Sequence, residues 1–185
     1  SIGLVLAYSC WTTVLYSSGI VLLARREGGF LKTFAPQKDS LRIVLLAHVL
    51  VVYTLGVCST LLIALLYAVT APEIFVAKGI GDLFTMLYWI LLGTFGSIGV
   101  LAVRLSFRSA ATVANIALFG MILVHFGASA AAWPINVVSY INPLSVVAQS
   151  IDGITLSTSY AVIGLSILLI TIGTAGLKYS RFGQS

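Results

Sequence analysis

Five long runs of the sequence contain no Asp, Glu, Lys or Arg, and these runs restrict the fold more than any other feature. Each run is long enough to cross the hydrocarbon core of a bilayer, which is about 30 Å thick and needs about 20 helical residues. Helices are required because an unpaired backbone group in lipid costs several kcal/mol, and the runs lack the alternating pattern of a β-barrel strand. The sequence therefore predicts five membrane-spanning helices, over residues 2–24, 43–71, 83–103, 109–132 and 154–177.

The overall composition agrees with this prediction. Hydrophobic residues make up 59% of the 185 residues and charged residues 8%, against roughly 25% charged residues in a soluble domain. With 10 basic and 5 acidic side chains, a soluble globule of this size would lack a polar surface. We therefore interpret residues 1–185 as a single all-α transmembrane domain of an integral membrane protein. Because the basic residues lie in short loops, the net charge of +5 indicates membrane topology and no nucleic-acid partner.

The loops also indicate the orientation of the chain in the membrane. If residues 25–42 are cytoplasmic, alternation of the spans also places residues 104–108 and 178–185 in the cytoplasm, and Lys78 is the one basic residue outside. This arrangement satisfies the positive-inside rule and predicts a cytoplasmic C-terminus in the cell (inner or plasma) membrane. The chain starts at Ser1, without a methionine and already within an apolar run, so we expect one more helix before it and six in the full chain.

The segment between the first two runs, residues 25–42, is the most highly charged part of the sequence. Phe30 and Phe34 are four residues apart and therefore share one helix face, away from the basic side chains. This pattern predicts a short amphipathic helix at the membrane surface, ended by Pro36. The alternative is a simple positive anchor with long side chains that reach the lipid headgroups. An anchor alone does not account for Glu27 and the two glycines that follow it.

The motif Arg26-Glu27-Gly28-Gly29-Phe30-Leu31-Lys32 resembles the Arg-Glu-x-Gly-x-Leu coupling segment of type-2 ABC exporter permeases. In that family a short cytoplasmic helix between the second and third spans docks into the ATP-binding subunit. An acidic residue in a basic loop can form a directional ion pair with a partner, and two glycines allow close approach of the backbone. The resemblance implies that the coupling residues are Arg26, Glu27, Gly28, Gly29, Phe30, Lys32 and Phe34. The sequence departs from the family at Gly29-Phe30, where a Gly-Thr pair is common.

A second unusual segment, residues 133–153, is apolar but is interrupted by Pro134, Asn142-Pro143 and Gly153. Its pieces are too short to span, so the pattern predicts two short re-entrant helices that enter from the external side. The motif Tyr140-Ile141-Asn142-Pro143-Leu144 resembles the Asn-Pro-Leu segment between the fifth and sixth spans of type-2 exporter permeases, where re-entrant helices form the external gate. The resemblance implies gate roles for Tyr140, Asn142, Pro143 and Leu144. The sequence departs from the family at Asp152, where a basic residue is common.

Several polar or small residues within the spans allow two interpretations each. Gly93, Gly96 and Gly99 are three residues apart and predict a groove for close helix packing, or alternatively a hinge. His48 and His125 are costly if they face lipid, so each either forms a structural hydrogen bond or lines a pathway for protons or substrate.

Missing motifs restrict the mechanism. The sequence contains no Gly-x-x-x-x-Gly-Lys-Ser/Thr phosphate loop and no His-Glu-x-x-His motif, so we expect a subunit that is not itself an enzyme. The resemblance implies a permease of an ATP-driven exporter of an amphipathic, lipid-like, drug, peptide or polysaccharide substrate. It further implies a second permease chain and separate subunits that bind ATP and Mg²⁺. The alternatives are a non-transporting membrane scaffold or immunity subunit, and an ion-driven secondary transporter.

Overall fold

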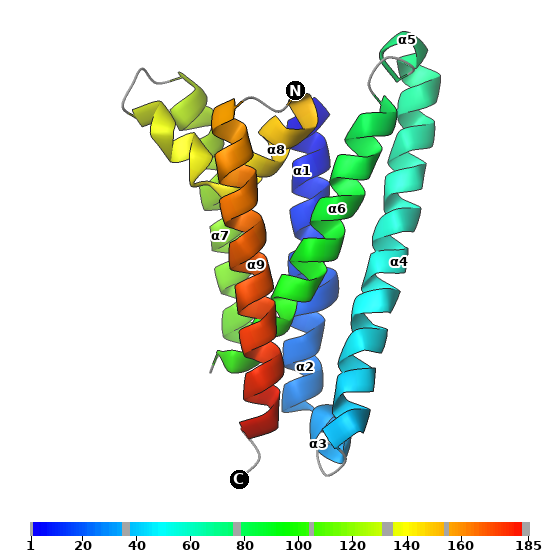
Figure 1. Ribbon diagram of the computed structural model, residues 1–185, viewed down its shortest axis with the longest axis vertical. Helices are drawn as coiled ribbons and strands as arrows, with labels where there is room; N and C mark the ends of the chain where they lie inside the picture. The colour runs from blue at the N-terminus through cyan, green and yellow to red at the C-terminus, as the bar shows by residue number, and fades with distance from the viewer. Residues whose placement is uncertain are drawn as a thin grey trace.

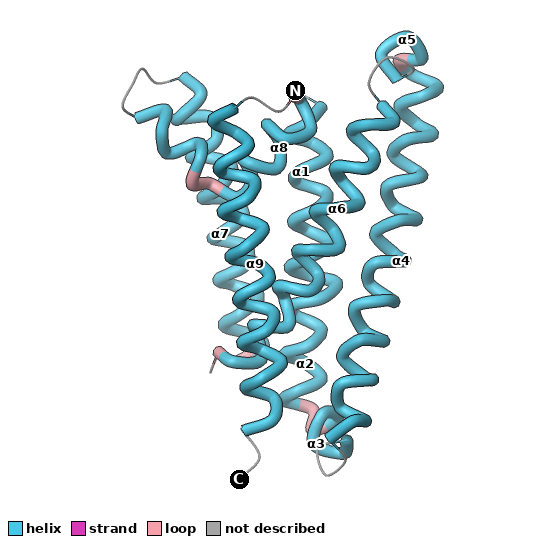
Figure 2. The backbone as a smooth tube through the Cα atoms, in the orientation of Figure 1, coloured by secondary structure: helices cyan, strands magenta, loops and turns pink. Residues whose placement is uncertain are grey.

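The computed structural model describes residues 2–34, 38–75, 79–103, 106–130, 135–153 and 156–182. Within these ranges the chain is almost entirely helical and contains no strand, and Figure 2 shows only short loops between the helices. The described residues include five long helices. These run side by side along the long axis of the molecule (Figure 1). The predicted all-α class is therefore confirmed. Several residues used in the predictions lie outside the described ranges, among them Ser1, Pro36, Lys78, Arg104, Trp133, Pro134 and the predicted span ends at residues 132 and 154.

The five long helices correspond to the five predicted spans. The first span consists of α1 (Ile2–Thr12), a π-helix η1 (Thr13–Ile20) and α2 (Val21–Glu27). The other four are α4 (Lys38–Thr70), α6 (Ile80–Ser97) with the 3-10 helix η3 (Ile98–Ala102), α7 (Phe107–Ala130) and α9 (Leu156–Phe182). All five are long and apolar enough to cross a membrane, which confirms the prediction of five such helices.

The helices extend beyond several of the predicted ends. The first span continues through Arg25 and Arg26 to Glu27 instead of ending at Ala24, and α4 begins at Lys38 instead of Ile43. Long charged side chains at a helix end can reach past the hydrocarbon into the headgroup region. A run without charges therefore marks the apolar core of a spanning helix and not the ends of the helix itself.

Four short elements connect the spans: α3 (Phe30–Phe34), α5 (Pro72–Ile74), η4 (Ile135–Tyr140) and α8 (Pro143–Asp152). The α3 element lies at the same end of the bundle as the end of α9, and we call this the α3 end (Figure 1). The start of α1, α5 and α8 lie at the opposite end, which we call the α5 end.

Backbone conformation explains where two of the short helices begin and end. Gly29 has a φ of 75° and separates α2 from α3, because a residue without a Cβ adopts this left-handed conformation at low cost. Asn142 has extended backbone and precedes Pro143, whose fixed φ suits the first position of α8. Gly153, with a φ of 144°, then ends α8.

The core lies between α1, α6, α8 and α9. In the interior, α1 packs against α8, and α6 packs against both α4 and α9. A Cβ on Gly96 would lie 2.9 Å from Leu169 Cδ2, and one on Gly99 would lie 2.8 Å from the Ile172 carbonyl oxygen. These two glycines allow α6 and η3 to approach α9 closely, whereas Gly93 faces Val14 of η1.

Large apolar side chains cover most of the outer surface. They are exposed along the lengths of α4, α7 and α9, and include Leu62, Ile116 and Ile167. A water-soluble domain rarely exposes so large an apolar area, whereas the hydrocarbon of a bilayer solvates it well. The exposed surface therefore agrees with five membrane-spanning helices.

Candidate functional site

The last turn of α2 is attached to the connection between η3 and α7. Arg26 Nη1 donates to the carbonyl oxygen of Val103 at 2.7 Å and, more weakly, to that of Leu101 at 3.4 Å. The backbone N–H of Phe107 donates to Glu27 Oε1 at 2.6 Å. Arg26 thus satisfies carbonyls that the end of η3 leaves free, and the Glu27 carboxylate lies at the positive end of the α7 dipole.

The α3 helix has one buried side and one exposed side. Leu31 is buried in a cluster with Leu22, Leu41 and Leu45, whereas Phe30 is exposed. The Arg25 guanidinium lies over the Phe30 ring, 5.5 Å from its centroid. Gly28 is exposed beside Phe30, so a partner can approach the backbone there. Two further predicted coupling residues, Lys32 and Phe34, belong to α3, but their side chains are not among the described ones.

At the α5 end, Asn142 is the centre of a buried polar network. Its side chain is 6% exposed, and Oδ1 accepts a hydrogen bond from the Leu144 N–H at 3.2 Å, which caps α8. Nδ2 donates to the Met121 carbonyl oxygen of α7 at 2.7 Å and to Ser145 Oγ at 2.9 Å. The same Ser145 Oγ is 3.0 Å from His125 Nδ1. Asn142 and His125, treated separately in the sequence, therefore belong to one network that joins α8 to α7.

Two other contacts hold α8 in place, and sequence patterns did not indicate them. Trp89 Nε1, in a side chain only 2% exposed, donates to Ser150 Oγ at 2.8 Å. The N–H of Gly3 donates to Asp152 Oδ1 at 3.2 Å and connects the end of α8 to the start of α1. Of the remaining predicted gate residues, Leu144 is fully buried and Tyr140 is largely at the surface. The motif that begins at Arg26 lies at the α3 end of the bundle, and the motif that begins at Tyr140 lies at the α5 end.

Polar side chains also occur inside the bundle. His48 is buried, with Nε2 3.2 Å from Ser18 Oγ, and Ser18 also bonds to Ser97 of α6. This arrangement gives His48 a structural hydrogen bond between α4 and η1. On the outer surface, Tyr16 of η1 bonds through its hydroxyl to Asn115 Oδ1 of α7.

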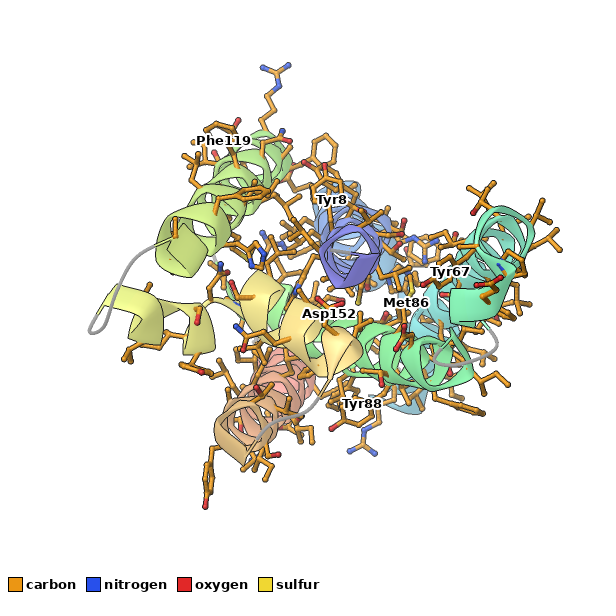
Figure 3. The ribbon with its side chains drawn as sticks, turned by 90° about the horizontal axis from the view of Figure 1, so that it is seen from above. Tyr8, Tyr67, Met86, Tyr88, Phe119 and Asp152 are labelled. Carbon is orange, nitrogen blue, oxygen red and sulfur yellow. The ribbon has the colours of Figure 1, made fainter. Side chains whose placement is uncertain are left out.

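The surface that α1, η1 and α7 share carries several polar side chains. Asn115 is exposed near the middle of α7, and Tyr8 is 44% exposed on α1. Figure 3 shows Tyr8 on α1 and Phe119 on α7 on the same side of the molecule. Two exposed hydroxyls on other helices are satisfied within their own helix, because Thr54 of α4 and Thr171 of α9 each donate to the carbonyl one turn earlier. We call the surface around Tyr8, Tyr16 and Asn115 the α1/α7 face.

The described part of the chain contains no group of three His, Cys, Asp or Glu side chains that could hold a metal ion. In comparisons with protein-family models, curated proteins and solved structures, no match to the chain was found.

Proposed function

We propose that this chain is the permease subunit of an ATP-driven exporter of the type-2 ABC class. Two copies, or two similar chains, would face each other across a substrate pathway. ATP and Mg²⁺ would be bound by separate subunits that dock at the α3 end. The positive-inside rule places that end, and the C-terminus, in the cytoplasm.

The observation that carries this proposal is the exposed carboxamide of Asn115 near the middle of a membrane-spanning helix. A polar side chain at this depth is costly in lipid and is normally found against protein or a water-filled cavity. The hydroxyls of Thr54 and Thr171 can face lipid because the helix backbone satisfies them, whereas the Tyr16 hydroxyl can satisfy only part of the Asn115 amide. The α1/α7 face is therefore the side that would line the pathway and face the second chain.

In such a transporter, the segment around α3 would dock the ATP-binding subunit, and the segment around α8 would form the external gate. Phe30 and Gly28 are exposed and the half-buried Gly29 lies between them, so an ATP-binding subunit could dock on this surface, and Lys32 and Phe34 continue the same helix. Arg26 and Glu27 connect that surface to η3 and α7, so a displacement of α3 would be transmitted to both.

A structural connection then runs along α7 to the predicted external gate. Near its other end, α7 contributes Met121 and His125 to the network of Asn142 and Ser145, which holds the start of α8. A tilt of α7 would therefore pull on α8 and on η4, the two short helices that we propose as the re-entrant gate. Such coupling requires that ATP bind one conformation of the complex more tightly than the other.

Thiol labelling in native membranes tests the pathway. In a chain with both cysteines changed to alanine, Asn115→Cys should react with a polar, membrane-impermeant maleimide, because a water-filled pathway supplies water to that site. The matched control is Thr54→Cys, which is exposed at a similar depth on α4 and should remain unlabelled in lipid. Equal labelling of the two positions would refute a pathway along the α1/α7 face.

The same assay separates transport from a scaffold role. When the chain is co-expressed with an ATP-binding subunit that copurifies with it, trapping the ATP-bound state should change the labelling rate of Asn115→Cys several-fold. A rate that is insensitive to ATP, in a complex that still copurifies, would favour the scaffold alternative. A rate that follows an ion gradient instead would favour the secondary transporter.

A further inference from the structure

A groove at the α3 end is lined by residues of α2, α3 and α4. Its lining residues are Arg25, Phe30, Val44, Ala47, His48 and Val51, and its volume is about 250 Å³. The groove is not on the α1/α7 face, and of its lining residues only Phe30 also belongs to the surface that we propose docks an ATP-binding subunit. Its composition is nevertheless unusual for a lipid-facing depression, since it has a cation at one end and an apolar wall along the rest.

The cation at the end of the groove is Arg25. Its neighbour Arg26 points to the opposite side, where it binds the carbonyl oxygens of Leu101 and Val103. Among the described side chains, no acidic group forms an ion pair with Arg25, and Glu27 accepts its hydrogen bond from the Phe107 N–H. The Arg25 guanidinium instead lies over the Phe30 ring. This stacking fixes the position of the planar group and leaves its N–H donors available for an anion.

The apolar wall of the groove comes from a single face of α4. Val44, Ala47, His48 and Val51 are spaced three and four residues apart, so they form one continuous stripe. At a rise of 1.5 Å per residue, this stripe extends about 10 Å from the level of Arg25 into the membrane. The His48 ring is held by Ser18 and only 4% exposed, so it adds little polar surface to the wall.

We propose that this groove binds an anionic phospholipid of the leaflet at the α3 end. The headgroup phosphate accepts hydrogen bonds from the Arg25 guanidinium, whose fork geometry suits two phosphate oxygens. One acyl chain lies along the stripe from Val44 to Val51. Under the positive-inside orientation this is the cytoplasmic leaflet, where basic pockets beside spanning helices bind anionic headgroups. A free phosphate fits less well, because most of the groove is apolar and offers it no further donor. This lipid site requires that the chain span a membrane, but it does not require that the protein be a transporter.

Lipid titration of the purified full-length chain in neutral detergent, followed by native mass spectrometry, tests this site. The probes are phosphatidylglycerol, phosphatidylcholine with the same acyl chains, and inorganic phosphate. Wild-type protein should retain phosphatidylglycerol in preference to phosphatidylcholine. Arg25→Gln should weaken phosphatidylglycerol binding by about fivefold, which corresponds to the roughly 1 kcal/mol that one basic side chain contributes near a membrane surface. Phosphatidylcholine binding should change little.

Two further variants make the result specific. Arg42→Gln removes the same charge from the same end of the bundle, but Arg42 is exposed and does not line the groove, so its effect should stay below twofold. Ala47→Trp fills the groove and should displace both lipids while Arg25 is retained. Equal effects of the two arginine substitutions would overturn the proposed site, because they would show that anionic lipid is attracted to all basic residues at this end of the bundle without a specific site. Full lipid binding by Ala47→Trp, or competition by inorganic phosphate alone, would also overturn it.

Discussion

Replacing Asn142 with alanine tests whether the polar network at the α5 end holds α8 against α7. The substitution removes the N-cap of α8, for which Oδ1 accepts from the Leu144 N–H, and loss of an N-cap costs about 1 kcal/mol. It also removes the hydrogen bond to the Met121 carbonyl, and interhelical hydrogen bonds in membranes contribute about 0.6 kcal/mol on average. With the lost contact to Ser145, the sum is about 2 kcal/mol.

Reversible unfolding in bicelles measures this free energy, and Asn142→Ser serves as the matched variant. Serine is a good N-cap but is too short to keep the bond to Met121, so it should recover about 1 kcal/mol of the loss. A free energy of unfolding for Asn142→Ala within about 0.5 kcal/mol of wild type would refute the reasoning, since that is the range of a surface substitution without structural contacts. Equal losses for alanine and serine would refute the assigned cap.

Two other substitutions test the interior by the same unfolding assay. Gly99→Ala places a Cβ against the backbone of Ile172 and should destabilise the protein by about 1–3 kcal/mol. The control Gly120→Ala should be neutral or stabilising, because a Cβ at Gly120 has nothing within 4 Å. Equal effects of the two substitutions would contradict the close packing of η3 on α9. Ser150→Ala leaves the buried Trp89 N–H without its acceptor, so it should lower the free energy of unfolding by about 1–3 kcal/mol and shift the tryptophan emission. An unchanged emission spectrum and an unchanged stability would show that this bond is dispensable.

Some features of this protein could be predicted from the sequence because they follow from the cost of burying polar groups in lipid. An unpaired charge or backbone group in hydrocarbon is so unfavourable that charge-free runs must be helices, and this sufficed for the number and approximate position of the spans. The positions of two helix breaks could also be predicted, because they depend on individual residues and not on distant contacts. The break between α2 and α3 at Gly28-Gly29 and the start of α8 at Pro143 depend on the conformations that glycine and proline allow.

Only the tertiary structure decided which helix faces meet. In a soluble protein the apolar stripe of a helix indicates its buried side, but lipid is as apolar as a protein core, so a spanning helix carries no such signal. The link of Asn142 to Met121 and His125 and the bond between Glu27 and Phe107 join residues far apart in sequence, and no local pattern could pair them. The exposed position of Asn115 likewise depends on the packing of α7 against η1, because sequence alone does not show which side of a membrane helix faces its neighbours.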